Sequence, residues 1–216
     1  MIVRVQVLAV FIVVWTLCAG QGGAETYPAS VRGIVDDPDV TYHTSFRVAC
    51  DEQLWNRILD NPQVWDKLWR IYHFKPHYKV AASGTSAQIT DPKGPVGDLT
   101  LVSRSGGRRV YLGKGALHHP KLPKLPLATM ALVIDARHGG KNTSGTVALY
   151  IQAENALARP VLKSISAPVT GHMGRMTDLY IQAFSIIIND AAHHPYGRVS
   201  STDTPEAKEV VRVLFE

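Results

Sequence analysis

The sequence predicts an α+β fold in which a curved antiparallel sheet grips a long C-terminal helix, with two short helices after the first strand. Three observations carry this prediction. Apolar residues recur at helical spacing through residues 166–194, alternating segments separated by turn residues fill residues 77–154, and two short tryptophan-rich helical patterns follow the first alternating segment. Because so long an apolar stripe must be buried, we expect the sheet to wrap around the helix.

Residues 1–24 have the features of a secretory signal peptide. A basic start that ends at Arg4 precedes an apolar run to Ala19, and small residues stand at the minus-three and minus-one positions of a cleavage site after Ala24. The run is short for a membrane span, although an uncleaved N-terminal anchor is the alternative. We therefore expect a secreted or periplasmic protein.

The remaining chain has a mild positive charge and one cysteine. Without residues 1–24, the chain has 22 basic and 18 acidic side chains, which gives a net charge of +4. This surplus suits transient contact with an anionic membrane surface but is too small to predict nucleic-acid binding. Cys50 has no partner for an internal disulfide, and we expect it to be a buried, unreactive thiol. The sequence does not indicate the oligomeric state.

The chain before the first strand is expected to hold little regular structure. Residues 25–40 contain Pro28, Gly33 and Pro38, and we interpret them as a lead-in to a single domain over residues 41–195.

The first strand and two short helices follow in order. Residues 41–50 alternate between apolar and polar side chains, which is typical of a half-buried strand. Asp51 suits the N-cap of a short helix, and Asn61-Pro62 provides a second helix start. These two helices carry three tryptophans, which are Trp55, Trp65 and Trp69.

Alternation and turn residues predict the remaining strands. A proline-rich loop is expected at residues 118–126, and a helical approach to the long helix is expected at residues 156–165. The strands are expected at residues 77–82, 87–90, 98–103, 108–117, 129–137 and 146–154.

The long helix contains two glycines that need an explanation. Gly171 and Gly174 either allow a strand or a ligand to approach closely, or mark a helix that begins or kinks only after Gly174. Pro195 ends the segment. Residues 196–216 are expected to form a polar tail with a short helix, packed late or mobile.

The order of elements resembles the helix-grip fold of the START-like superfamily, which includes polyketide cyclase-like and lipid-transfer domains. The resemblance covers residues 41–194 and is one of layout, because this superfamily has no invariant catalytic motif. The long loop and the extra helical approach depart from its simplest members and leave the strand register open. The segments on which the resemblance rests are FRVACDEQLWNRILDNPQVWDKLW, GDLTLVSRSGGRRVYLGKG and the long helix.

The resemblance implies an apolar ligand, a lipid or terpenoid, in a cavity of several hundred Å3 between the sheet and the long helix. Arg109 is a candidate for holding an anionic headgroup. Ordinary core packing is the alternative for each of the other candidates. On the helix these are Met173, Met176, Tyr180 and Phe184, near the mouth Trp65 and Trp69, and on the sheet Leu112, Met130, Leu132 and Leu149.

The residues give weaker indications of catalysis, and we expect no catalytic residue, cofactor or metal. The chain has no HExxH, CxxC or GxSxG motif, and adjacent histidines on a strand point to opposite faces. His172, Arg175 and Asp178 lie at helical spacing, so they form either an acid–base group in the cavity or a surface pairing.

Three functions fit these observations. The first is an exported carrier that binds a hydrophobic small molecule or lipid. The second is a cyclase- or hydrolase-type enzyme that uses the same cavity. The third is an envelope-associated interaction module whose interior is fully packed.

Overall fold

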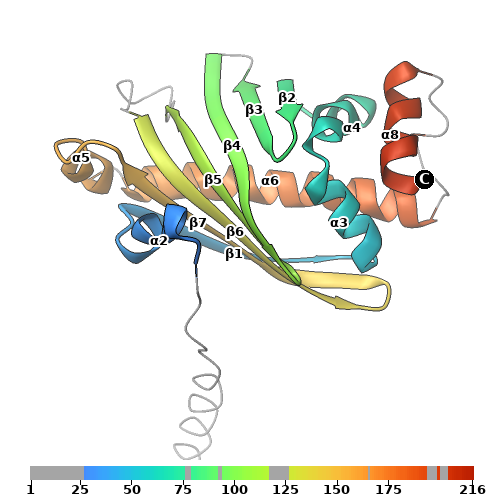
Figure 1. Cartoon of the computed structure of the whole chain (residues 1–216), viewed down its shortest axis with the longest axis horizontal. Helices are drawn as coiled ribbons and strands as arrows, with labels where there is room; N and C mark the ends of the chain where they lie inside the picture. Colours follow the sequence, from blue (N-terminus) through green and yellow to red (C-terminus); the bar gives the residue numbers. More distant parts are fainter. Residues whose placement is uncertain are drawn as a thin grey trace, which may run out of the picture.

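The computed structural model describes residues 27–75, 79–91, 94–116, 127–164, 166–193, 199 and 204–216. A seven-stranded sheet in the order β1-β7-β6-β5-β4-β3-β2 forms its centre, and every neighbouring pair is antiparallel. The sheet is curved and open, with β1 and β2 at its edges (Figure 1). The strands are β1 (Val40–Val48), β2 (Lys79–Ser83), β3 (Ser86–Asp91), β4 (Gly94–Ser105), β5 (Arg108–Ala116), β6 (Leu127–Gly139) and β7 (Asn142–Ala153).

The long helix α6 (Ser166–His193) crosses the sheet on its concave side and packs against β1, which confirms the predicted α+β helix-grip fold (Figure 1). The helix begins before both glycines. A Cβ on Gly174 would lie 2.9 Å from the ring of Tyr42 on β1. Of the explanations given for the two glycines, close approach of a strand therefore holds at Gly174.

The two short helices after β1 form as expected. They are α3 (Glu52–Asp60) and α4 (Trp65–Ile71), joined by the 3-10 turn η1 (Pro62–Val64). The Asp51 carboxylate caps α3, since its Oδ1 accepts a hydrogen bond of 2.8 Å from the Leu54 N–H. The Trp55 ring stacks on Phe46 of β1 at 4.8 Å between centroids, so α3 is packed directly on the sheet.

A helix occupies the segment that we expected to be irregular. α2 (Ala29–Asp36) buries Val31 and Ile34 against Val110 and Ala131 on the outer face of the sheet. The expectation of little regular structure here was wrong, because Pro28 precedes the first helical residue rather than interrupting the helix. The outer face of the central strands is consequently covered in part.

A buried carboxylate joins the beginning of β1 to the end of β7 and to α5 (Arg159–Ser164). The Asp39 side chain is fully buried and accepts a 2.9 Å hydrogen bond from the Ala153 N–H. The Arg159 Nε also donates to Asp39 at 2.9 Å. The expected helical approach to α6 is therefore present and fixed to the sheet.

The C-terminal segment is part of the main core. In α8 (Pro205–Phe215), the Thr204 hydroxyl accepts a hydrogen bond from the Ala207 N–H, as a helix cap does. Val210 and Leu214 are buried in the same apolar cluster as α3 and α4. Of the two states expected for this tail, the described helix α8 has the packed one.

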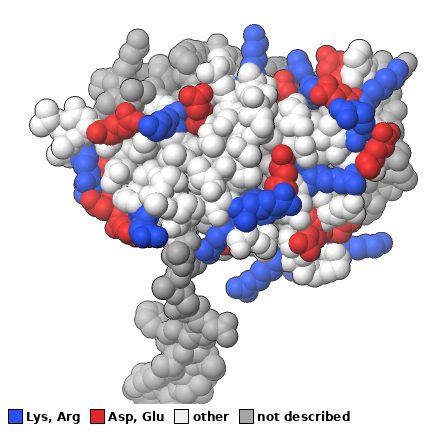
Figure 2. Space-filling model, viewed as in Figure 1, with Lys and Arg blue, Asp and Glu red and all other residues white. Residues whose placement is uncertain are grey.

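Some predictions concern residues outside those that the structure describes. These are the signal peptide at residues 1–24 and the loop at residues 118–126. Among the helices that are described, none is both long and apolar enough to span a membrane. On the face shown in Figure 2, positive and negative side chains are interspersed rather than gathered by sign.

Candidate functional site

An apolar cavity of about 340 Å3 lies between the concave face of the sheet, the short helices α3 and α4, and α6. Its size falls at the lower end of the range for small-molecule sites. Strand alternation explains its floor, because Leu132 and Ile134 of β6 lie opposite Leu149 and Val147 of β7 and all four face inward.

The helical walls follow from helical spacing. Ile181, Phe184 and Ile188 recur at intervals of three and four on α6 and present one apolar face to the cavity. Trp65 and Trp69, one turn apart on α4, form the opposing wall. The cavity is therefore enclosed by aromatic and branched aliphatic side chains from elements far apart in the sequence.

The structure brings together six of the residues that the sequence singled out. The side chains of three further candidates on α6, Met173, Met176 and Tyr180, lie outside the described part of the chain. The six that line the cavity are Trp65, Trp69, Met130, Leu132, Leu149 and Phe184.

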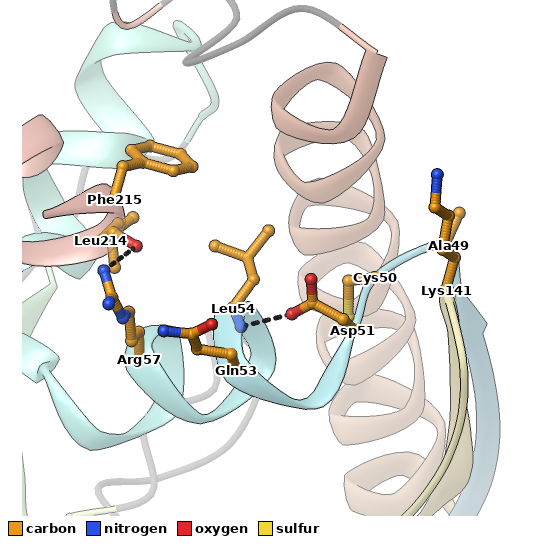
Figure 3. Close-up of a pocket in the computed structure, with 9 residues that line it drawn as sticks. All are labelled: Ala49, Cys50, Asp51, Gln53, Leu54, Arg57, Lys141, Leu214 and Phe215. Atoms are coloured by element: carbon orange, nitrogen blue, oxygen red, sulfur yellow. Dashed lines mark hydrogen bonds between the residues drawn. The ribbon is translucent and has the colours of Figure 1, made fainter.

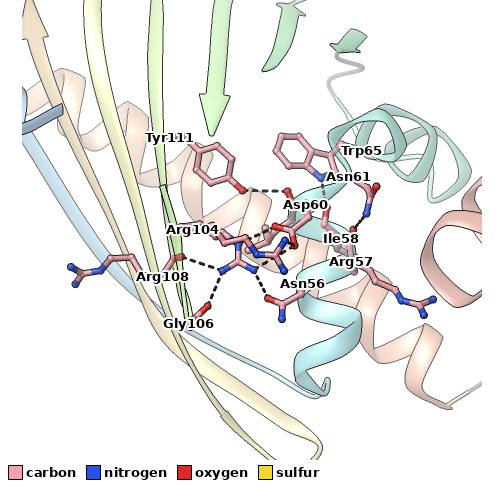
Figure 4. Close-up of polar contacts among 12 residues, drawn as sticks. Asn56, Arg57, Ile58, Asp60, Asn61, Trp65, Arg104, Gly106, Arg108 and Tyr111 are labelled. Atoms are coloured by element: carbon pink, nitrogen blue, oxygen red, sulfur yellow. Dashed lines mark hydrogen bonds and ion pairs between the residues drawn. The ribbon is translucent and has the colours of Figure 1, made fainter. Parts of the chain in front are cut away.

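Arg109 does not line the cavity, because its donors are occupied within the protein. The side chain is only 1% exposed, and its Nε donates to the Asp60 carboxylate at 3.0 Å. Nη2 donates to the Asn56 Oδ1 at 2.7 Å, and Nη1 donates to the Gly106 carbonyl at 2.9 Å (Figure 4). Arg109 thus fixes α3 to the β4–β5 hairpin and has no free donor pair for an anionic headgroup.

Leu112 lies on the opposite face of the sheet. It pairs with Ala131, whereas its neighbour Tyr111 pairs with Leu132. Since side chains alternate along a strand, Tyr111 faces the cavity and Leu112 packs on the outer face with the cluster around α2.

Several lining residues were not selected from the sequence, although a signal for them existed. Ile134 and Val147 stand two residues from the selected Leu132 and Leu149, so strand alternation places them on the same face. Ile181 and Ile188 lie three and four residues from Phe184. Tyr111 carried no such signal, because its neighbours Val110 and Leu112 are also apolar.

Few polar groups border the cavity, and two of them are hydrogen-bonded to backbone carbonyls. The Tyr111 hydroxyl donates to the Leu59 carbonyl at 3.3 Å, and the Trp65 Nε1 donates to the Ile58 carbonyl at 2.7 Å (Figure 4). Burial, followed by the nearby Asp60 charge, raises the pKa of Tyr111 above its ordinary value. Tyr111 therefore stays neutral and serves as part of an apolar wall.

Asp178, a member of the acid–base group considered on α6, does not line the cavity. Asp178 accepts a hydrogen bond of 3.1 Å from the Tyr42 hydroxyl and lies within 3.5 Å of the Thr44 hydroxyl, both on β1. Asp178 is exposed and is not among the cavity-lining residues. Its contacts attach α6 to the sheet edge, which is a structural role.

A second depression of about 310 Å3 lies where α3, α8 and the β6–β7 turn meet (Figure 3). Two of its polar groups contact the protein itself: Arg57 Nη1 donates to the Leu214 carbonyl at 3.0 Å, and Asp51 caps α3. Cys50 borders this depression but is only 3% exposed, and burial raises its pKa. Its thiol is therefore buried as expected, and the raised pKa disfavours the thiolate form.

The described residues contain no group of three His, Cys, Asp or Glu side chains placed to hold a metal ion.

Fold and cavity together define a helix-grip protein with an apolar interior site. No family model matches the chain, and no curated protein matches it. A conserved protein from Geobacillus kaustophilus has a similar solved structure, with a TM-score of 0.51 and 12% identity over 70% of this chain and 97% of its own. At this identity the likeness supports the helix-grip fold and nothing further.

Two other solved structures are less similar in shape. Protein Ms6760 from Mycobacterium smegmatis has a TM-score of 0.48 and 15% identity, over 73% of this chain and 96% of its own. Ara h 8.0201 has a TM-score of 0.47 and 8% identity, over 68% of this chain and 96% of its own.

Proposed function

We propose that this protein binds and carries an apolar small molecule or lipid in the cavity between the sheet and α6. The observation that supports this most is the cavity itself: about 340 Å3 of apolar space lies among residues of the main core cluster. Natural interiors contain few voids larger than a water molecule, so an apolar space of this size indicates a ligand site.

The proposal favours a carrier over the other functions considered. A fully packed interaction module would leave no such space. An enzyme would need several reactive polar groups on the wall, whereas the hydroxyl of Tyr111 and the ring N–H of Trp65 are hydrogen-bonded to backbone carbonyls and the Asp66 carboxylate is ion-paired with Arg70. A carrier needs shape and apolar area alone, because burial of apolar surface provides the binding free energy.

We place this function in the START-like helix-grip superfamily and outside the cytoplasm. The first part rests on the layout shared with that superfamily, and the second rests on the signal-peptide features of residues 1–24. Transient contact with a membrane surface would allow an apolar ligand to enter without crossing water.

Binding of the neutral fluorophore N-phenyl-1-naphthylamine tests the proposal directly. We expect fluorescence enhancement that saturates at one probe per chain, and a lipid or other apolar compound in the organic extract of protein purified from its natural host. Absence of both results would overturn the proposal.

A matched pair of variants locates the probe. Leu132→Trp fills the cavity and should weaken probe binding at least about tenfold, since the indole occupies the volume the probe needs. Leu112→Trp introduces the same side chain one strand away on the outer face and should leave the affinity unchanged. Equal effects of the two variants would place the probe elsewhere.

A further inference from the structure

The cavity has one wall that is not purely apolar. Asp66 follows Trp65 directly and lies one turn before Trp69 on α4, and it borders the cavity together with them. Its side chain is only 15% exposed. Burial is the largest influence on the pKa of this carboxyl and raises it, whereas the Arg70 charge lowers it less. Water thus solvates the carboxylate poorly, as a position against an apolar space requires.

The charge of Asp66 is only partly balanced. Arg70 Nη2 lies 3.3 Å from Asp66 Oδ2, but the Arg70 side chain is 52% exposed and does not border the cavity. The second aspartate at the cavity edge, Asp98, pairs with Gln88 and accepts its side-chain hydrogen bond. Strand alternation puts that carboxylate on the outer face, since the next residue, Leu99, faces inward.

The neighbouring polar groups also offer acceptors rather than donors. The Trp65 ring N–H and the Tyr111 hydroxyl donate hydrogen bonds to backbone carbonyls of α3. The Tyr111 oxygen can still accept a further hydrogen bond. The Asp66 carboxylate accepts only. Of the described side chains that border the cavity, none is a lysine, an arginine or a histidine. A ligand that brings its own donor finds partners here, whereas a carboxylate meets like charge and acceptors.

We propose that the cavity selects apolar molecules whose polar end is a neutral or cationic hydrogen-bond donor, a hydroxyl or an amine, and that Asp66 is the residue that discriminates against fatty acids. This inference rests on the proposed carrier function and specifies its ligand class. It also differs from the anionic headgroup for which Arg109 was the candidate from sequence, because Arg109 is bound to Asp60 and Asn56.

Competition between matched ligands tests this specificity. The protein is saturated with N-phenyl-1-naphthylamine at neutral pH, and decanol, decylamine and decanoic acid are titrated against the probe. Decanol and decylamine should displace it at concentrations about tenfold or more below that of decanoic acid, because a like charge in a poorly solvated site is costly.

Two variants assign the effect to Asp66. Asp66→Asn removes the charge at nearly constant volume. The affinity for decanoic acid should therefore rise about tenfold, and the preference for decylamine should disappear. Arg70→Gln leaves Asp66 without its ion-pair partner, and it should increase the preference for decylamine over decanoic acid.

The outcomes separate this inference from the carrier proposal. If the probe binds and all three compounds displace it equally well, the discrimination is absent and this inference fails while the carrier function stands. The same holds if Asp66→Asn leaves the ranking unchanged. If the probe does not bind and the organic extract of the native protein holds no apolar compound, the carrier proposal and this inference fail together.

Discussion

Arg109 on β5 and Asp60 at the end of α3 form an ion pair in which the arginine is buried and the aspartate partly buried, with Arg109 Nε donating to Asp60 Oδ1 at 3.0 Å. Arg104 contacts the other carboxylate oxygen at 2.8 Å, but its side chain is 56% exposed. One carboxylate therefore receives a buried and an exposed arginine (Figure 4). The pair sets the position of α3 on the sheet and hence one wall of the cavity.

The two arginines should differ sharply in their contribution to stability. Arg109→Met removes a buried donor from Asp60, Asn56 and two backbone carbonyls, in a setting that is partly buried. We expect a loss of about 3–5 kcal/mol in the free energy of unfolding, measured by urea denaturation. Arg104→Met is the control and should cost no more than about 1 kcal/mol, as exposed ion pairs do. Similar losses for the two variants would contradict the assigned role of Arg109.

The two glycines of α6 should respond to alanine in opposite directions. At Gly171 the nearest atom to a new Cβ is 3.7 Å away, an ordinary contact, so Gly171→Ala should stabilise by about 0.5–1 kcal/mol through helix propensity. At Gly174 the new Cβ would lie 2.9 Å from the Tyr42 ring. Gly174→Ala should therefore destabilise by about 1–3 kcal/mol despite the same gain in propensity.

Thermal or urea unfolding of both variants measures this contrast. Adding Tyr42→Ala to Gly174→Ala removes the ring, so the alanine should cost less in that background than in the native one. Stabilisation by both alanines would show that α6 and β1 are not in close contact at this point.

Tyr111 should make the protein sensitive to alkaline pH. Its folded-state pKa lies above the unfolded value of about 10 because burial penalises the phenolate. Below pH 10 both states are protonated and the contribution of Tyr111 is fully present. As the pH rises above 10 only the unfolded chain releases the proton, so stability falls by up to about 1.4 kcal/mol per pH unit.

The comparison with Tyr111→Phe isolates this effect from other titrating groups. At neutral pH the variant should be about 1 kcal/mol less stable, because the hydrogen bond to the Leu59 carbonyl is lost. Above pH 10 the difference in the free energy of unfolding between the two proteins should narrow and then reverse, since phenylalanine has no proton to lose. A gap that stays constant from pH 7 to pH 11 in urea denaturation would show that Tyr111 is not shielded from water.

The sequence predicted the order of elements well because alternation and capping are local signals. Asp51 and Asn61-Pro62 marked both short helices, and the long helix was found nearly to the residue. Local signals failed where both faces of a strand are covered. Val110, Tyr111 and Leu112 are all apolar, so only the register against β6 decides which of them faces the cavity.

Arg109 shows a second limit of prediction from sequence. Two adjacent arginines beside a hairpin turn are typical of an exposed surface, and an anionic ligand is a reasonable partner for them. The actual partner, Asp60, lies 49 residues earlier in the chain and reaches Arg109 only after α3 has packed on the sheet. Partners this distant are set by tertiary structure, which no local pattern encodes.

The C-terminal helix α8 should prove essential to the fold, contrary to what its polar composition suggests. Leu214 is 2% exposed and packs in the cluster that contains α3 and α4, whereas its neighbour Val213 is half-buried. Leu214→Ala should cost about 2–5 kcal/mol in urea denaturation, while Val213→Ala should cost less than about 1 kcal/mol. The bond from Arg57 to the Leu214 carbonyl involves the backbone and survives the change, so the loss measures packing alone. If Leu214→Ala leaves the global transition unmoved, α8 unfolds separately and does not stabilise the helices that line the cavity.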